Sequence, residues 1–236
     1  MFGRFLELSL ATSDIAASVR FYERLGFAQL PCTDSWPHAY CALGDGQFVL
    51  GLHQRATPEA ALCFVHAGLA RHAQVLRAAG FAVTDERLGD DHFHELRLRD
   101  PDGREVLLLE ARTFSPAAIR VDASRCGSFL GWSLPTPQPE AQAAFWERAG
   151  LVAFEPQERP WPHRPLSGDG LSLALHDPRL LPQPALIYGT DDVAARLAVL
   201  DEAGITPSRA PLHAGGPAGA ALLRAPEGTL LWLLPE

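Results

Sequence analysis

The stretch FLELSLATSDIAASVRFYERLGF, residues 5–27, decides the fold, because it recurs as FLGWSLPTPQPEAQAAFWERAGL at residues 129–151. The two copies match at 10 of 23 positions without a gap. Each copy has the alternating polarity of a strand, then a polar turn, then an amphipathic helix that ends at a glycine. An internal repeat of this kind predicts a fold built from similar units.

A finer repeat lies within each copy. Four predicted helices end at Gly26, Gly80, Gly150 and Gly204, and the spacing is 54 residues within each pair. We therefore expect four units of strand, helix and three strands. The predicted fold class is α+β, with two tandem domains, each a curved mixed sheet that carries its helices on the convex side. The expected boundaries are a first domain over residues 1–112, a linker over 113–124 and a second domain over 125–236.

Composition limits the possible partners of the chain. The 236 residues carry a net charge of −8 and are 47% hydrophobic. An acidic balance argues against nucleic acid, and no apolar run reaches the ~20 residues of a membrane span. The acidic balance is compatible with a cationic small-molecule ligand. The four cysteines have no C-x-x-C spacing, which favours a reduced, cytoplasmic setting. Every basic residue except histidine is arginine, so lysine Schiff-base chemistry is excluded.

The first predicted strand separates two kinds of side chain. Strict alternation places Leu6, Leu8 and Leu10 on one face and Glu7 and Ser9 on the other. If the leucines are covered by helices, the opposite face forms a polar trough, and this trough is where we expect function to lie.

Three features together resemble the vicinal oxygen chelate superfamily. They are the Ser13-Asp14 helix cap, the F-Y-x-x-L-G-F helix end at residues 21–27 and the turn Asp100-Pro101-Asp102-Gly103 before a last strand. The superfamily includes glyoxalase I, extradiol dioxygenases, fosfomycin-resistance enzymes and bleomycin-resistance binding proteins. The resemblance covers nearly the whole chain and implies two βαβββ units around a cupped sheet in each domain.

The resemblance also implies where metal ligands would stand. The corresponding positions are Glu7, Gly51, Ala61 and Leu107 in the first domain, and Gly131, Ala174, Ala185 and Trp232 in the second. Only Glu7 has a side chain of the usual ligand types, whereas a catalytic metal is held by about three protein ligands. We therefore predict no metal and no other cofactor. A divalent metal in an atypical site that includes Glu7 is the alternative.

Duplicated residues supply further candidates. His53 and His176 each close an L-x-L-H strand, and Trp36-Pro37-His38 reappears as Trp161-Pro162-His163. These residues could line a ligand site, or the copied hairpin could simply pack against the neighbouring domain. Strand alternation also turns two charged residues of the strand near 94–99 toward the trough. The predicted ligand-binding residues are Glu7, Ser9, Trp36, His38, His53, Glu95, Arg97, His176 and Trp232.

Two functions remain open on these grounds. The first is a small-molecule binding protein of the glyoxalase and bleomycin-resistance type without a metal, in which Glu7 accepts a hydrogen bond from the ligand. The second is a metal-dependent lyase, isomerase or dioxygenase resembling glyoxalase I. The chain could act as a monomer with pseudo-dimeric domains or as a homodimer.

Overall fold

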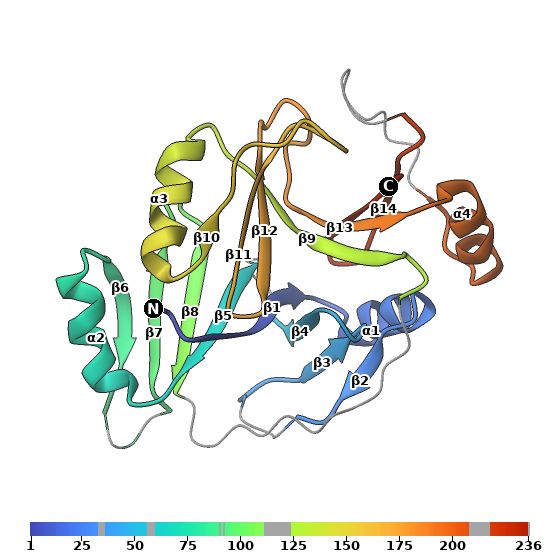
Figure 1. Ribbon diagram of the computed structural model, residues 1–236. Coiled ribbons are helices and arrows are strands. Elements are labelled where there is room, and N and C mark those ends of the chain that lie inside the picture. The colour runs from blue at the N-terminus through green and yellow to red at the C-terminus, as the bar shows by residue number, and fades with distance from the viewer. Residues whose placement is uncertain are drawn as a thin grey trace.

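The computed structural model describes residues 1–32, 36–55, 60–89, 91, 93–110, 124–207 and 218–235. Within these ranges the chain forms two mixed sheets of eight and seven strands, with four helices (Figure 1). The predicted α+β class and the tandem arrangement of strand–helix–strand units are confirmed. The predicted linker 113–124 lies outside the described residues apart from Ser124.

The first sheet joins two units through their first strands. Its order is β2-β3-β4-β1-β5-β8-β7-β6, with β1 antiparallel to β5 at the centre. Each first strand also runs parallel to the last strand of its own unit, β1 to β4 and β5 to β8. The elements are β1 (Arg4–Thr12), α1 (Ile15–Arg24), β2 (Ala28–Leu30), β3 (Tyr40–Gly44), β4 (Val49–Gln54), β5 (Ala61–His66), α2 (Leu69–Ala78), β6 (Val83–Arg87), β7 (Glu95–Arg99) and β8 (Glu105–Glu110).

The second sheet repeats this plan in the order β10-β11-β12-β9-β13-β15-β14, with β9 antiparallel to β13. The stretch 208–217, where the fourth unit needs its first strand after the helix, lies outside the described residues. The elements are β9 (Ser128–Pro135), α3 (Pro139–Ala149), β10 (Val152–Ala153), β11 (Arg164–Gly168), β12 (Leu171–His176), β13 (Ala185–Thr190), α4 (Val193–Glu202), β14 (Ala221–Arg224) and β15 (Leu230–Pro235).

The four repeated glycines all have the left-handed backbone that the helix ends require. Their φ angles are +94° at Gly26, +81° at Gly80, +119° at Gly150 and +74° at Gly204. Glycine adopts this conformation without a steric penalty, which is why it stands just beyond each helix. The conformation therefore repeats together with the 54-residue spacing, and the prediction of four helix-ending glycines is confirmed.

The predicted strict alternation in the first strand is wrong at one position. The pairing of β1 with β5 is irregular between Phe5 and Glu7. Leu6 consequently packs with Cys63 and its neighbours on the trough side, whereas Leu8 and Leu10 belong to the main core. A bulge of this kind places one extra residue on a strand face, so Leu6 and Glu7 both lie on the trough side.

A single hydrophobic core extends across both halves of the chain. Phe2, which precedes β1, contacts Phe64 of the first half and Trp146 of the second, with ring centroids 5.6 and 6.1 Å apart. Its backbone N–H donates to the carbonyl of Ala149 at 2.9 Å. The two halves thus share the core that forms on the helix-bearing sides of the sheets.

The last turn of each half contacts the first helix of the other. Glu227, in the turn after β14, accepts hydrogen bonds from Ser18 (2.7 Å) and Tyr22 (2.6 Å) of α1. Asp102, in the turn after β7, accepts hydrogen bonds from Gln142 of α3 (2.9 Å) and from Gln138 just before it (3.3 Å). These reciprocal contacts relate the halves by an approximate twofold symmetry.

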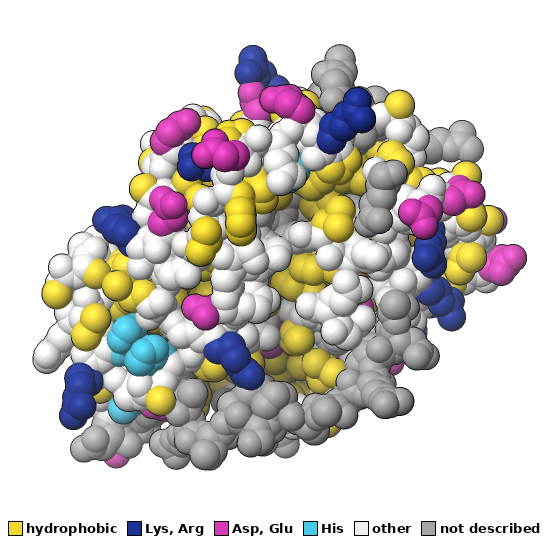
Figure 2. Space-filling view, in the orientation of Figure 1, with side chains coloured by type: hydrophobic (Ala, Val, Ile, Leu, Met, Phe, Trp, Pro, Cys, Tyr) yellow, Lys and Arg dark blue, Asp and Glu magenta, His cyan; other side chains and the backbone are white. Residues whose placement is uncertain are grey.

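The visible surface carries dispersed charge. Figure 2 shows acidic and basic side chains intermixed over one face, with no large patch of a single sign. All four cysteines, including Cys63 and Cys126 in the interior, are free thiols. Within the described ranges, none of the helices has the length and apolar character needed to cross a membrane.

Candidate functional site

Strands β1 and β4 bring the polar candidates of the first half together. The two strands run parallel, with Ser9 opposite Gly51 and Ala11 opposite His53. Because the leucines at 8, 10, 50 and 52 belong to the main core, the residues between them turn toward the trough. Glu7, Ser9 and His53 are brought together there, and all three are buried.

The Glu7 carboxylate is enclosed by three donors. Ser9 Oγ lies 2.8 Å from Glu7 Oε1 and His53 Nε2 lies 3.3 Å from the same oxygen. The Tyr40 hydroxyl donates to Oε2. Burial, and then the charge of Glu7, raises the pKa of Tyr40 and keeps its phenol in the donating form. Glu7 itself is 2% exposed.

Gly51 makes room for this carboxylate. A Cβ atom added at Gly51 would lie 2.0 Å from Glu7 Oε1 and 2.2 Å from its carboxyl carbon. The carboxylate therefore occupies the space that any side chain at position 51 would need. For this reason Glu7 lies beneath the trough surface, supporting Ser9 and His53.

A chain of polar contacts continues outward from Glu7. His53 Nδ1 lies 3.0 Å from His38 Nε2, and Arg55 Nε donates to that same His38 nitrogen at 3.2 Å. Because an arginine N–H can only donate, His38 Nε2 is the acceptor and His53 Nδ1 carries a proton. Burial, then the charges of Arg55 and His53, lowers the pKa of His38, in keeping with a neutral ring.

This hydrogen-bond pattern links the buried carboxylate to the surface of the trough. The Glu7–His53 pair and His38 form one continuous set of polar contacts that ends at Arg55. A ligand that contacts Arg55 or His53 therefore contacts a member of this set.

Two arginines reach the trough beside this pair. Arg97 donates to Glu95 and to Glu105, both at 2.6 Å. Burial alone would lower the pKa of Arg97, but its two carboxylate partners raise it. Arg55 lies over the ring of Trp36, with its guanidinium carbon 5.4 Å from the ring centroid. Burial, and then the charge of Arg97, lowers the pKa of Arg55, although a guanidinium remains charged.

These groups surround a cavity of about 310 Å³. Its size lies at the lower end of the range for small-molecule sites. Glu7, His38 and Glu95 are not part of its lining, but each contacts a residue that is, His53 or Arg97. The cavity is lined by Ser9, Leu10, Ala11, Trp36, His53, Arg55, Ala61, Arg97, Glu105 and Leu107.

The corresponding trough of the second half has large rings at its base, beside a cavity of about 1010 Å³ that Gly131, Trp161 and Ile187 help to line. Trp232 is fully buried and packs against Trp161, with ring centroids 5.5 Å apart. His176 contacts Ser133 Oγ at 2.6 Å and the carbonyl of Leu181 at 2.8 Å. Burial lowers the pKa of His176. Its two predicted site residues, His176 and Trp232, therefore take part in packing rather than line an open cavity.

Sequence reasoning missed three residues of this site. They are Tyr40, Arg55 and Glu105. Tyr40 stands two residues after His38 and Arg55 two after His53, so the alternation of the trough face could have identified both. Glu105 is paired in register with Ala61, which is visible only once the two strands are aligned.

The described residues do not fit the metal that the fold's metalloenzymes carry. Glu7 and His53 are two donors, but the other positions of the first trough are Gly51, Ala61 and Leu107. Both donors already have hydrogen-bond partners, and within the described ranges three or more His, Cys, Asp or Glu side chains nowhere gather into a metal-binding group. Burial, and then the charge of Glu7, raises the pKa of the neighbouring Cys63 and keeps it a thiol, although metals bind the thiolate.

Comparison with known proteins gives no match to a family model and none to a curated sequence. Solved structures match over 99% of the chain. A catechol 2,3-dioxygenase is 15% identical, is covered over 87% of its length and has a TM-score of 0.60. A Mn(II)-bound glyoxalase from Novosphingobium aromaticivorans is 14% identical, with 82% coverage and a TM-score of 0.63. A mutant 4-hydroxymandelate synthase from Streptomyces coelicolor is 14% identical, with 92% coverage and a TM-score of 0.60. The chain therefore has the fold of the vicinal oxygen chelate superfamily.

Proposed function

We propose that this protein binds a small organic molecule in the trough of its first half, without a metal. The observation that carries the proposal is the position of the Glu7 carboxylate, which fills the side-chain space of Gly51 and accepts from Ser9 and Tyr40. A metal at this point would have to displace those donors and would find no third His, Cys, Asp or Glu ligand grouped with Glu7 and His53 among the described residues. Binding therefore depends on the groups around the trough.

The charge of the cavity favours an acidic ligand. Arg55 and Arg97 both line it. Arg97 is already paired with Glu95 and Glu105, whereas Arg55 has no ion pair among the described residues and is the cation open to a ligand. The acceptor role predicted for Glu7 required that residue to reach the ligand, and it does not line the cavity. A cationic ligand is therefore the less favourable proposal. Trp36 adds an aromatic wall beneath Arg55, and planar acids combine well with such a pair. The ligand class we propose is a small planar organic acid.

The second candidate is a metal-dependent lyase, isomerase or dioxygenase. It is supported by the similar structures, which include a catechol 2,3-dioxygenase and a Mn(II)-bound glyoxalase. The 3.3 Å separation of Glu7 Oε1 and His53 Nε2 is also compatible with two ligands of one ion. On this reading, removal of metal abolishes function.

A binding assay in the presence and absence of EDTA separates the two candidates. We expect aromatic and other planar carboxylates to raise the thermal midpoint of the EDTA-treated protein, and amines of the same size to have no effect. Arg55→Gln should weaken carboxylate binding by about tenfold, which corresponds to about 1.4 kcal/mol. Arg20→Gln, on the exposed side of α1, is the matched control and should bind normally. Binding that disappears in EDTA and returns with Fe, Mn, Ni or Zn would reject the metal-free proposal.

A further inference from the structure

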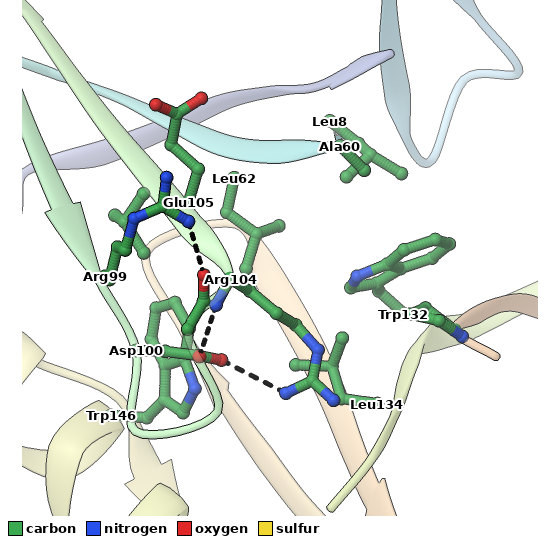
Figure 3. Close-up of a pocket in the computed structure, with 13 residues that line it drawn as sticks. Leu8, Ala60, Leu62, Arg99, Asp100, Arg104, Glu105, Trp132, Leu134 and Trp146 are labelled. Carbon is green, nitrogen blue, oxygen red and sulfur yellow. Dashed lines mark hydrogen bonds and ion pairs between the residues drawn. The ribbon is translucent and has the colours of Figure 1, made fainter. Parts of the chain in front are cut away.

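A second cavity, of about 330 Å³, lies where the two halves of the chain meet (Figure 3). Strands β1, β5 and β8 of the first half form one side, and β9 and α3 of the second half form the other. The turn that joins β7 to β8 lies at its edge. The cavity is separate from the trough, because it opens on the helix-bearing side of the first sheet, where Leu8 and Leu62 point.

The walls of this cavity are mainly apolar. Leu8 and Leu62 face Trp132 and Trp146 across the boundary between the halves, and each of the four is at most 5% exposed. Leucine and indole surfaces make few hydrogen bonds with water, so water inside such a space is poorly held. Apolar molecules of matching size bind in cavities of this type.

The charged residues at the edge are already compensated. Asp100 accepts from the backbone N–H of Arg104 at 2.8 Å, and the Arg104 guanidinium donates to Asp100 at 3.2 Å and to Asp102 at 2.9 Å. The same guanidinium donates to the carbonyl of Pro135 in the second half.

The lining contains two arginines and two carboxylates. Glu105 is paired with Arg97 of the trough, and Arg99 is exposed and donates to the carbonyl of Gly103 at 2.7 Å. The enclosed part of the cavity is therefore apolar, and a neutral ligand is favoured.

One polar group in the wall has no acceptor. Trp132 is 4% exposed, and no hydrogen bond joins its Nε1 to any other residue in the described part of the chain. The edge of the ring that carries Nε1 faces the cavity in Figure 3. Trp146 differs, because its Nε1 donates to Gln142 at 3.0 Å. Trp132 Nε1 is not among the fully buried polar atoms that lack a partner, unlike the Nε1 atoms of Trp161 and Trp232, so this donor is accessible and available to a ligand in the cavity.

From these observations we infer a second binding site, for a neutral ring compound that carries one hydrogen-bond acceptor. The ring lies between the leucines and the indoles, and a carbonyl or ether oxygen accepts from Trp132 Nε1. The inference goes beyond the trough and does not depend on the function proposed for it.

Acetophenone, ethylbenzene and benzoate are suitable probes, because they have similar sizes but differ in acceptor and charge. We would record the five indole N–H signals of the ¹⁵N-labelled full chain, assigned by triple-resonance spectra. Acetophenone should move the Trp132 N–H proton downfield and shift the Trp146 signal. Ethylbenzene should perturb both signals without the downfield shift, and benzoate should leave them unchanged. The signal of Trp36, in the trough, should not respond to acetophenone.

Trp132→Phe tests the donor directly while keeping an aromatic wall. It should weaken acetophenone binding by roughly three- to tenfold, the contribution of one neutral hydrogen bond, and leave ethylbenzene binding unchanged. Trp161→Phe is the matched control, because that indole lies in the second trough with an unpaired Nε1, and its loss should alter neither affinity. If Trp132→Phe does not fold, the wild-type shifts decide the question. A Trp132 signal that ignores all three probes, or a response confined to Trp36, overturns the inference.

Discussion

Replacing Gly51 by alanine tests how firmly the Glu7 carboxylate is held. The new methyl carbon would stand 2.0 Å from Glu7 Oε1, so the carboxylate has to leave its place. Hydrogen bonds to a charged group contribute about 1.5–3 kcal/mol each. Loss of the two hydroxyl donors, Ser9 and Tyr40, therefore costs about 3–6 kcal/mol on that scale. Replacing glycine by alanine at a compatible backbone position stabilises the folded state by about 0.4–1 kcal/mol, because it lowers the entropy of the unfolded chain. We expect Gly51→Ala to lower the free energy of unfolding by about 2–5 kcal/mol.

A double-mutant cycle identifies the cause of that loss. Glu7→Ala removes the carboxylate and vacates the space that the methyl group needs. Adding Gly51→Ala to Glu7→Ala should then cost little, and the coupling free energy should reach about 2 kcal/mol or more, well above the scatter of independent sites. Urea unfolding, followed by circular dichroism and by fluorescence, supplies the four stabilities. Simple additivity of the two substitutions would refute the packing of Glu7 over Gly51.

Three further predictions concern titration and the contacts between the halves. Burial, and then a neighbouring carboxylate, raises the pKa of Tyr22, Tyr40 and Tyr188, the three tyrosines of the chain. Their contribution to stability is therefore complete below about pH 10 and is lost as the pH rises, because only the tyrosines of the unfolded chain ionise near that value. The absorbance of tyrosinate at 295 nm should therefore rise only when the protein unfolds. A rise in the native protein at pH 10 would contradict this. Tyr22→Phe should cost about 1.5–3 kcal/mol in urea unfolding through the lost bond to Glu227, and the cost should shrink when Glu227 is already glutamine. Burial opposes ionisation of Asp102, but its hydrogen bonds lower its pKa. Its contribution to stability is therefore present above about pH 4 and is lost in acid. Asp102→Asn should reduce the loss of stability between pH 6 and pH 3, measured by urea unfolding at each pH.

The repeated unit could be predicted because it depends on local patterns. The four glycines at helix ends reflect a backbone conformation that other residues disfavour, so their spacing shows in the sequence. The polar face of β1 was also predictable from alternation at Ser9. Alternation failed at Leu6, because the irregular pairing with β5 depends on a strand some 55 residues away. A bulge of this type leaves no mark in the residues of one strand alone.

The site was harder to predict, because its residues depend on distant partners. Glu7 stood out because it is the one side chain of the usual ligand types at the positions that the resemblance implies, yet its enclosure by Tyr40 needs the register of β3, β4 and β1. Glu105 is invisible without the pairing of β5 with β8. Whether Trp132 Nε1 finds a hydrogen-bond acceptor similarly depends on how the two halves pack, and no local sequence pattern predicts it.

The two copies of Trp-Pro-His show how one duplicated hairpin came to have two uses. In the second half Trp161 packs over His163 and against Trp232, and the same tryptophan lines a cavity of about 1010 Å³. In the first half the residue paired in register with Cys63 is Leu107 rather than a large ring, so Trp36 has no such partner and borders a cavity with Arg55. The presence or absence of one large side chain on the last strand thus decides whether the hairpin tryptophan packs against a second ring, as Trp161 does, or borders the cavity with Arg55, as Trp36 does. A substitution that introduces a large ring there, Leu107→Trp, should abolish carboxylate binding while the second half remains folded.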